Sequence, residues 1–537
     1  MALMIGMAQI NPLVGDIPGN TARVLAEASR AQAQGMDVLV FPELTLTGYP
    51  PEDLLLRSSL DIRMDAAIQQ LCEKLPAELW VVCGYPRRGP EGLANVAGVF
   101  HGGRRVVEYR KQHLPNYQVF DEKRYFITGH EPCVLEIKGV RVALSICEDI
   151  WEPSPMQQAR AAGAALMLNI NASPFHVGKP AEREALLRQR ATEGAMPVVY
   201  VNQVGGQDEL VFDGGSFAVS REGRVCARAP AYAESLLAVS FDGGDLQPAT
   251  VAAIADTDAS LYQALVLGVC DYVNKNGFPS VLLGLSGGID SALTLAIAVD
   301  ALGADRVSAV MMPFRYTSSM SLEDAEAEAR TLGVHYRVLS IEPMFESFAE
   351  SLADEFAGLP MDVTEQNIQA RCRGVLLMAL SNKTGALVLT TGNKSEMAVG
   401  YATLYGDMAG GLDVLKDVSK TRVYALSRYR NTQAMVIPQR VIDRPPSAEL
   451  APDQKDSDSL PDYEVLDAIL ERYIEHDMSA SAMIAEGFDE TDVAHVIRLV
   501  DRNEYKRRQA AIGIRVTRRG FGRDRRYPVT SGWQAGD

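Results

Sequence analysis

Three side chains that could do chemistry each follow an apolar run in the first half of the chain. They are Glu43 after the run 37–41, Lys111 after 106–110, and Cys147 after 140–146. Apolar runs of this length predict buried β-strands, and a carboxylate at the end of such a strand is well placed to act as a general base. Cys147 is followed at once by acidic and aromatic residues, so we expect it at a strand end rather than inside the core. Taken singly, a glutamate in a turn and a small buried cysteine would both be ordinary structural residues.

The sequence around these residues resembles the nitrilase/amidase superfamily. The resemblance is carried by the phrases Phe41-Pro-Glu43-Leu, Tyr109-Arg-Lys111-x-x-Leu-Pro and Ile146-Cys147-Glu-Asp. It implies an αββα sandwich in which Cys147 attacks the carboxamide carbon of glutamine, Glu43 moves the thiol proton to departing ammonia, and Lys111 helps to hold the oxyanion. A free cysteine has a pKa of about 8.5, so this thiol needs activation by its neighbours. We therefore expect residues 1–245 to form a nitrilase-like glutaminase.

Two further segments resemble the substrate loops of the glutaminase branch of that superfamily. The first, 114–126, contains Tyr117, and the second, 168–179, contains Ser173 and Lys179. By this resemblance all three residues bind glutamine, with Ser173 and Lys179 at its amino-acid end. Without it, each would be an ordinary turn residue.

A small-residue loop between an apolar run and a helix dominates the second half of the chain. The run 281–285 predicts a buried parallel strand, and 292–302 predicts a helix. Glycines let a backbone approach a ligand, and the N–H groups that open a helix favour an anion. The loop lacks the lysine of a Walker A motif and the spacing of the G-x-G-x-x-G fingerprint. A glycine-rich turn with a Ser/Asp cap would be the plain structural alternative.

Ser286-Gly-Gly-Ile-Asp290-Ser resembles the pyrophosphatase loop of ATP-dependent adenylating enzymes. Two more motifs, Thr391-Gly-Asn-Lys-Ser-Glu396 and Tyr405-Gly-Asp407, narrow the resemblance to NAD synthetases. It implies ATP binding by Gly284, Leu285, Ser286, Gly287, Gly288, Ile289, Asp290, Ser291 and Thr391. It implies Mg²⁺ binding by Asp290 and Glu396, whose hard carboxylate oxygens suit that ion. It also implies deamido-NAD binding by Asn367, Arg371, Glu396, Asp413, Lys420 and Lys506.

The elements that position these residues predict an α/β chain of two domains. Strands and helices alternate after residue 258, which indicates a Rossmann-like parallel α/β domain over 259–537. The resemblance of its loop implies that this domain is of the adenine nucleotide alpha hydrolase (pyrophosphatase-loop) type. A Gly/Pro break marks 246–258 as the linker. We expect the helix 321–332 to be capped by Ser321 and Asp324, and the polar, proline-rich segment 444–461 to order over bound nucleotide. The basic segment 502–526 is predicted to bind phosphates and to make interface contacts.

Bulk composition excludes several classes of function. The chain has 537 residues and a net charge of −17, which argues against nucleic acid as its main partner. Its seven cysteines are scattered and include no C-x-x-C pair, which suits a reducing compartment. The N-terminus is unlike a signal peptide, and no apolar run reaches the ~18 residues that span a membrane. We expect a cytoplasmic enzyme with no membrane association. Because large two-domain amidotransferases often assemble, we also expect a homo-oligomer.

Together the two resemblances, which cover essentially the whole chain, imply a ligase that amidates deamido-NAD to NAD. ATP would adenylate the carboxylate and release pyrophosphate. Ammonia from glutamine would then reach the adenylate through an internal channel, leaving NAD, AMP and glutamate. The alternatives are another glutamine-dependent adenylating amidotransferase, a tRNA-modifying ligase, or a binding protein with a decayed glutaminase. The intact Glu43, Lys111 and Cys147 set argues against decay, and the Thr391–Glu396 motif argues against the other ligases.

Overall fold

The computed structural model describes residues 2–447, 449–451 and 460–533. The chain divides into two compact units, the first ending at Ala255 and the second beginning at Asp256. This division falls inside the segment 246–258 that we expected to be a linker. None of the helices in the described ranges is long and apolar enough to cross a membrane.

Two β-sheets form the centre of the first unit. One runs in the order β15 (Asp245–Leu246), β14 (Ser235–Asp242), β1 (Leu3–Gln9), β2 (Val38–Val40), β3 (Trp80–Gly89), β4 (Gly92–His101), β5 (Arg104–Arg110). The other runs in the order β13 (Val225–Arg228), β12 (Phe217–Val219), β9 (Val198–Asn202), β8 (Leu166–Asn171), β7 (Val140–Ile146), β6 (Cys133–Ile137). A hairpin of β10 (Val204–Gln207) and β11 (Leu210–Asp213) stands beside them.

The alternation of side chains along a strand explains why these strands are apolar throughout. In β2, Val38 and Val40 join the core between the two sheets, where they meet Ile146 and Val201. Leu39 points the other way and joins the cluster that the helices cover. Successive side chains of a strand face opposite sides, so a sheet covered on both faces needs an unbroken apolar run.

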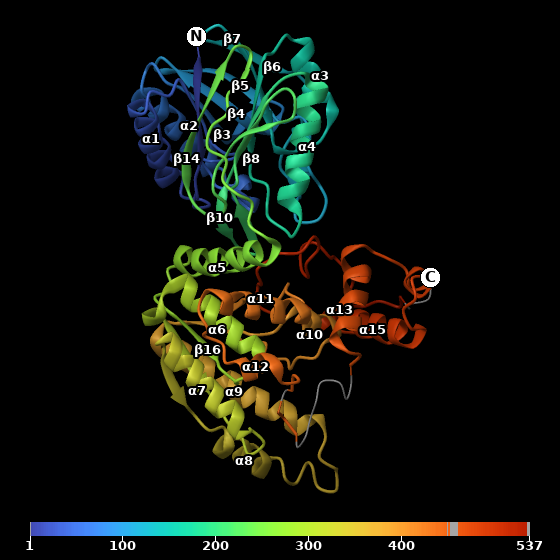
Figure 1. Cartoon of the computed structure of the whole chain (residues 1–537). Coiled ribbons are helices and arrows are strands. Elements are labelled where there is room, and N and C mark those ends of the chain that lie inside the picture. The colour runs from blue at the N-terminus through green and yellow to red at the C-terminus, as the bar shows by residue number, and fades with distance from the viewer. Residues whose placement is uncertain (1, 448, 452–459, 534–537) are drawn as a thin grey trace. The chain divides into compact units, whose positions relative to one another are not determined.

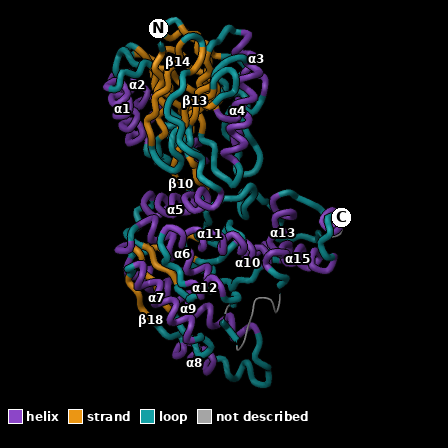
Figure 2. The backbone as a smooth tube through the Cα atoms, viewed as in Figure 1, coloured by secondary structure: helices purple, strands orange, loops and turns teal. Residues whose placement is uncertain are grey.

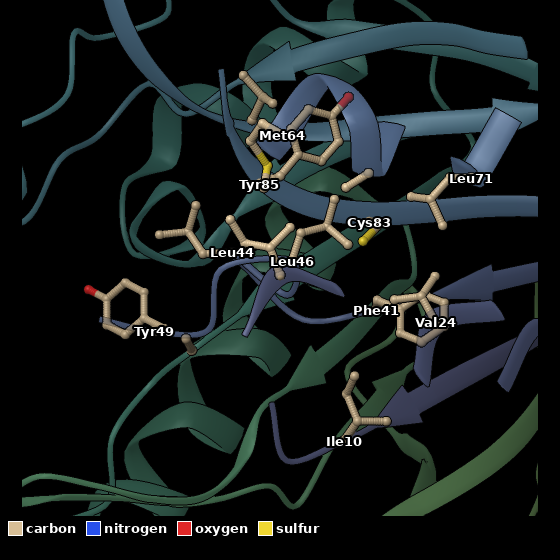
Figure 3. Close-up of a cluster of buried hydrophobic side chains, with 14 of the residues drawn as sticks. Ile10, Val24, Phe41, Leu44, Leu46, Tyr49, Met64, Leu71, Cys83 and Tyr85 are labelled. Atoms are coloured by element: carbon tan, nitrogen blue, oxygen red, sulfur yellow. The ribbon is translucent and has the colours of Figure 1, made fainter. Parts of the chain in front are cut away.

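Helices cover the outer face of each sheet and complete an αββα sandwich (Figure 2). α1 (Ile17–Ala33) and α2 (Ser59–Lys74) cover the first sheet, and α3 (Pro153–Ala161) and α4 (Lys179–Gly194) cover the second. Figure 3 shows part of the cluster under α1 and α2, where Val24, Met64 and Leu71 meet Phe41 and Tyr85. The predicted fold class of this half is confirmed.

The second unit is built on a parallel sheet with the strand order β18 (His335–Val338), β17 (Val307–Met311), β16 (Val281–Gly284), β19 (Leu387–Thr390), β20 (Leu412–Asp413). α6 (Ile289–Leu302) packs against β16 and β17 and against α5 (Thr257–Lys275) and α11 (Lys420–Gln433). A second apolar cluster joins the sheet to α8 (Glu342–Ser351) and α9 (Val363–Thr384). The predicted parallel α/β fold is confirmed.

Four further helices of this unit pack against one another. α10 (Lys394–Val399), α13 (Tyr463–Leu470), α14 (Ala480–Ala485) and α15 (Glu490–Arg502) share one apolar cluster. α12 (Gln439–Asp443) and α16 (Glu504–Arg507) are short. The predicted cap of α7 (Ser319–Leu332) is wrong, because Ser318 caps the helix and accepts a bond from the Ser321 amide at 3.2 Å. Asp324 instead pairs with Arg440 of α12 at 2.9 Å.

Candidate functional site

The first unit brings the three predicted catalytic residues together at strand ends. Glu43 lies just beyond β2, Lys111 directly follows β5, and Cys147 directly follows β7 of the facing sheet. All three side chains are buried, Glu43 and Lys111 completely. The charges of Glu43 and Lys111 both act on the Cys147 thiol. The unit therefore holds a thiol, a carboxylate and an ammonium in one water-poor site.

Lys111 is the centre of a buried ion-pair network. Its Nζ donates to Glu43 Oε1 at 2.7 Å and to both carboxylate oxygens of Glu122 at 2.9 Å. Glu43 also accepts from Asn95 Nδ2 at 2.7 Å and from the Ala172 amide at 3.2 Å. Burial lowers the pKa of Lys111, but Glu122 and Glu43 more than reverse this, so the net shift is upward and the ammonium keeps its charge.

Sequence reasoning missed Glu122. This residue opens a single 3-10 turn, Glu122–Arg124, where no periodic pattern shows that its side chain points inward. Burial raises its pKa to about 7, although Lys111 opposes the shift. Tyr49 donates a hydrogen bond to it at 2.9 Å. Lys111 is thus held between two carboxylates rather than one.

The backbone presents Cys147 in an unusual conformation. Cys147 opens the short 3-10 helix Cys147–Ile150 with φ of +43°, a region that non-glycine residues rarely adopt and that is often found at functional sites. Burial raises the pKa of its thiol, the Glu43 charge raises it further, and Lys111 opposes both. The thiol is therefore protonated at neutral pH, so attack needs a base that takes the proton as the bond forms.

Asp149 ties the turn of Cys147 to the chain that follows Lys111. Its Oδ2 accepts from the Ile146 amide at 2.9 Å and from the Tyr109 hydroxyl at 2.7 Å. Its Oδ1 accepts from the amides of Gln112 and His113 at 3.0 and 2.8 Å. Four bonds to one buried carboxylate fix the relative positions of the two strand ends.

The predicted glutamine contacts lie around this site. The Tyr117 hydroxyl donates to both oxygens of Glu148, the residue that follows Cys147, at 3.0 and 3.1 Å. Ser173 is buried just after β8, and its Oγ accepts from Arg183 Nε at 3.1 Å. Lys179 opens α4, where its Nζ lies 3.8 Å above the Trp151 ring. Burial and the nearby Arg183 charge lower the pKa of Lys179, whereas Glu182 and an ionised Cys147 act to raise it.

In the second unit, the predicted phosphate loop joins β16 to α6. Ser291 Oγ accepts from the Ser286 amide at 3.2 Å and donates to the Gly288 carbonyl at 2.9 Å, which closes the loop on itself. Gly287 has φ of +77°, and a Cβ there would lie 2.3 Å from the Ser321 carbonyl oxygen. Glycine is therefore required at that position. Gly284, Leu285 and Ile289 flank the loop at the strand end and the helix start.

The predicted metal ligands lie next to this loop. Asp290 is in the first turn of α6, Glu396 is in the first turn of α10, and Lys420 Nζ bridges them at 2.6 and 3.1 Å. Asn393, which sequence reasoning missed, caps α10 and donates to Asp290 at 2.8 Å. Among the described residues, no group of three or more His, Cys, Asp or Glu side chains is arranged so that it could hold a metal ion by itself. The available ligands are the two carboxylates of Asp290 and Glu396, which already pair with the Lys420 ammonium. Two carboxylates suit an Mg²⁺ ion that is also bound by phosphate oxygens.

The other predicted deamido-NAD residues form a second group around the segment 400–404. Asn367 Oδ1 accepts from Thr403 Oγ1 at 2.9 Å, and Arg371 Nε donates to the Leu404 carbonyl at 3.2 Å. Lys506 Nζ donates to the Gly400 and Ala402 carbonyls at 2.7 and 2.9 Å. All three side chains therefore hold this segment of backbone in place.

Two predicted residues lie at the strand ends beside the second motif. Thr391 follows β19, and Asp413 is buried in the neighbouring β20. A Cβ on Gly392 would lie 3.6 Å from Asp413 Oδ2, so this carboxylate borders the Thr391–Glu396 loop. Burial raises the pKa of Asp413 to about 7, and the Lys416 charge opposes the shift.

The segment 444–461 is described only in part, because residues 448 and 452–459 lie outside the described ranges. Arg444 donates to the Gly287 carbonyl, and Glu449 accepts from Ser318 Oγ and Ser321 Oγ, both at 2.9 Å. The described part thus contacts the phosphate loop and the start of α7.

Some of the arginines in the basic segment 502–526 pair with acids of the same segment. Arg507 bonds to Glu504 at 3.0 Å and Arg515 to Asp524 at 2.6 Å, and all four side chains are buried. These two arginines serve the packing of the segment rather than an exposed phosphate-binding surface.

Comparison with known proteins matches the two units to two families. Residues 4–250 match the carbon-nitrogen hydrolase family, and residues 261–510 match NAD synthase. The chain is 52% identical over 538 residues to the glutamine-dependent NAD(+) synthetase of Acinetobacter baylyi, covering 99% of both chains. It is 48% identical to the solved glutamine-dependent NAD+ synthetase of Acinetobacter baumannii in complex with ADP, with a TM-score of 0.82 over 100% of both chains. The enzyme from Cytophaga hutchinsonii shares the fold, with a TM-score of 0.85 at 23% identity over 99% of this chain and 98% of that one.

These likenesses extend over both units and agree with the thiol site of the first and the phosphate loop of the second. The chain belongs to the glutamine-dependent NAD(+) synthetase family, ligases that make NAD from deamido-NAD with glutamine as the nitrogen donor.

Proposed function

We propose that the first unit releases ammonia from glutamine at Cys147 and that the second unit transfers this ammonia to adenylated deamido-NAD. The observation that carries the proposal is the buried Glu43–Lys111 ion pair beside the Cys147 thiol. A protonated thiol, a carboxylate to take its proton and a fixed cation are the parts that thioester chemistry on an amide requires.

The proposed hydrolysis uses these side chains in order. Glu43 takes the Cys147 proton as sulfur bonds to the carboxamide carbon, and Lys111 stabilises the oxyanion that forms. Glu43 then returns the proton to nitrogen, and ammonia leaves a glutamyl thioester. Water, deprotonated by Glu43, cleaves the thioester and releases glutamate. Tyr117, Ser173 and Lys179 hold the substrate.

In the second unit, the proposed substrate of the phosphate loop is ATP. The solved relative from Acinetobacter baumannii was obtained with ADP, which supports this assignment. The backbone from Gly284 to Ser291 receives the phosphates and Thr391 borders the adenosine. Asp290 and Glu396 would hold Mg²⁺, whose charge would neutralise the pyrophosphate that leaves. Asn367, Arg371, Glu396, Asp413, Lys420 and Lys506 are proposed to hold deamido-NAD.

Ammonia must travel between the two chemistries without reaching solvent. At neutral pH free ammonia is mostly ammonium, which is not a nucleophile, so we infer an internal channel. The test is turnover with ¹⁵N-amide glutamine in the presence of unlabelled ammonium. Retention of ¹⁵N in NAD supports a channel, and full exchange with the external pool rules it out.

The assignment of glutamine hydrolysis to the first unit and NAD synthesis to the second is tested with the Cys147→Ala variant, supplied with either glutamine or ammonium. We expect NAD synthesis from ammonium to continue and synthesis from glutamine to cease. Loss of both activities in a folded variant would overturn the proposed division, since Cys147 would then serve the synthetase reaction as well.

The proposal includes a cytoplasmic location and a homo-oligomeric state. All seven cysteines are free thiols, which supports a reducing compartment. Light scattering of the purified protein measures the assembly, and a monomeric mass would contradict it.

A further inference from the structure

The side chain of Lys420 occupies the space between the two proposed metal ligands. Its Nζ lies 2.6 Å from Asp290 Oδ2 and 3.1 Å from Glu396 Oε1. The lysine side chain is almost fully buried, with 3% of its surface exposed, whereas the two carboxylates are 18% and 19% exposed. The ammonium therefore sits behind carboxylates that still reach solvent, where an incoming cation would meet them.

The position of Lys420 in its helix is electrostatically unfavourable. It is the first residue of α11, and the N-terminal end of a helix carries partial positive charge that disfavours a cation. Asp290, by contrast, lies in the first turn of α6, where a carboxylate is favoured without any lysine. The two carboxylates thus hold an ammonium at a place that its own helix disfavours.

Two cations cannot share this pair of carboxylates at low cost. A divalent ion bound to Asp290 and Glu396 would lie within a few ångströms of the Lys420 ammonium, and partial burial strengthens their repulsion. Asp290 lies at the end of the phosphate loop, so a bound nucleotide would bring negative charge to the same place. The Lys420 ammonium can turn toward the phosphates, because its flexible side chain moves while the backbone stays fixed.

The backbone of Lys420 is anchored independently of its ammonium. Its amide donates to Ser395 Oγ at 2.9 Å, and the next amide, of Thr421, donates to Asp467 at 2.8 Å. α6, α10 and α11 pack together in the second unit (Figure 1). A swing of the side chain therefore requires no movement of these helices.

We propose that Lys420 is the resting counter-ion of the metal ligands, which excludes a free divalent cation and releases the carboxylates when nucleotide phosphates take its ammonium. This inference rests on the proposed assignment of Asp290 and Glu396 as metal ligands. If Lys420 acts in this way, metal and nucleotide bind cooperatively. By thermodynamic linkage, bound nucleotide raises the affinity for the metal by the same factor by which bound metal raises the affinity for the nucleotide. Metal thereby enters with ATP rather than before it.

The test measures Mn²⁺ binding to the full-length enzyme by the electron paramagnetic resonance signal of the free ion. Without nucleotide, we expect Lys420→Met to bind Mn²⁺ about tenfold more tightly than the wild type, within the usual range of coupling between sites. Lys420→Arg keeps the positive charge and should bind as weakly as the wild type. With α,β-methylene-ATP, wild-type affinity should rise strongly, whereas the affinity of Lys420→Met should rise much less.

Control variants separate this effect from general electrostatics. Arg422→Met removes one positive charge from the same helix, where Arg422 pairs with Asp258 at the surface, and should leave Mn²⁺ affinity unchanged. The double variant Lys420→Met/Glu396→Gln should lose the tighter binding. Lys420→Gln provides a second neutral side chain if the methionine variant is unstable. Equal Mn²⁺ affinity of the wild type and a folded, neutral Lys420 variant without nucleotide overturns the inference.

The experiment also distinguishes failure of the underlying metal assignment. If Glu396→Gln binds Mn²⁺ and α,β-methylene-ATP as well as the wild type does, the proposed metal ligands are wrong and the inference falls with them. If Glu396→Gln weakens that binding but neutral Lys420 variants do not tighten binding of Mn²⁺ alone, the metal site stands and only the role of Lys420 is overturned.

Discussion

Arg183 donates from Nη1 to both carboxylate oxygens of Asp213, at 2.7 and 2.9 Å, and both side chains are buried. The other donors of Arg183 reach the loop after β8. Nε bonds to Ser173 Oγ at 3.1 Å, and Nη2 bonds to the Ser173 and Pro174 carbonyls at 2.8 and 3.0 Å. The ion pair thus fixes an arginine that positions a proposed glutamine contact.

Replacing Arg183 by lysine should weaken glutamine binding more than turnover. Lysine can keep the charge opposite Asp213 but cannot reach the three acceptors of the loop at once. We expect the KM for glutamine to rise about tenfold, since charged hydrogen bonds contribute about 1.5–3 kcal/mol each. Steady-state kinetics with glutamine and with ammonium check this, and the ammonium-dependent rate should not change. Arg188→Lys, at an exposed pair with Glu184 on the same helix, is the matched control. A fall in kcat at constant KM would contradict a positioning role.

Glu122→Gln should slow glutamine hydrolysis about 100-fold, because it removes one of the two charges that hold Lys111. The pKa of Glu122 is about 7, so its carboxylate becomes neutral as the pH falls below that value. We therefore expect the wild-type rate of glutamine hydrolysis to fall below about pH 7, and this dependence to be missing in the variant. Glutaminase rates between pH 5.5 and 8.5 measure both effects. A variant with the wild-type pH profile would show that another group is responsible.

The contrast between Glu43 and Glu122 shows what the sequence of the first unit could predict. Glu43 follows a strand whose apolar run is visible in the sequence, and a strand end is where a sheet displays polar side chains. Glu122 lies in an isolated turn, and its buried carboxylate is held by Lys111 and Tyr49. These contacts join different segments of the chain, so no local pattern of apolar residues predicts them.

In the second unit, the local sequence predicts the phosphate loop better than it predicts the contacts around that loop. The glycine at position 287 is required by its own backbone angle and by the closeness of Ser321. The cap of α7 was placed three residues late, because Ser318 and Ser321 are chemically equal candidates and only the fold decides between them. In the segment 502–526, acids such as Asp524 neutralise some of the arginines in three dimensions, which a count of charges along the sequence does not reveal.

Asp413→Asn should stabilise the protein at alkaline pH while impairing NAD synthesis. The buried carboxyl has a pKa of about 7, against about 3.9 in an unfolded chain, and within the described residues its Oδ1 has no hydrogen-bond partner. The folded state therefore binds this proton more tightly, and the free energy of unfolding decreases as pH rises from about 4 to 7. Above pH 7 the whole cost of the buried charge is present, on the order of a few kcal/mol. Asparagine removes that cost.

Thermal unfolding of wild type and Asp413→Asn at pH 4.5 and pH 8 tests this assignment. The gain in melting temperature should appear at pH 8 and nearly vanish at pH 4.5, where the wild-type carboxyl is protonated. A gain of equal size at both pH values would mean that packing rather than ionisation is responsible. Loss of ammonium-dependent synthesis in the stabilised variant would fit a residue kept for function at the expense of stability.

Gly287→Ala should abolish NAD synthesis from either nitrogen source while glutamine hydrolysis continues. Alanine at φ of +77° costs about 1–2 kcal/mol, and its Cβ would lie 2.3 Å from the backbone oxygen of Ser321, so the phosphate loop must move. Gly303→Ala is the matched control, because Gly303 has φ of +81° with open space around its Cβ at the far end of α6. With ψ of 150°, Gly303 lies in a backbone region that is nearly restricted to glycine, so alanine there is strained without displacing the phosphate loop. The control should therefore lower the melting temperature but retain synthesis. If Gly287→Ala and Gly303→Ala lose stability and synthesis to the same extent, the close approach of Ser321 is not what requires a glycine in the loop.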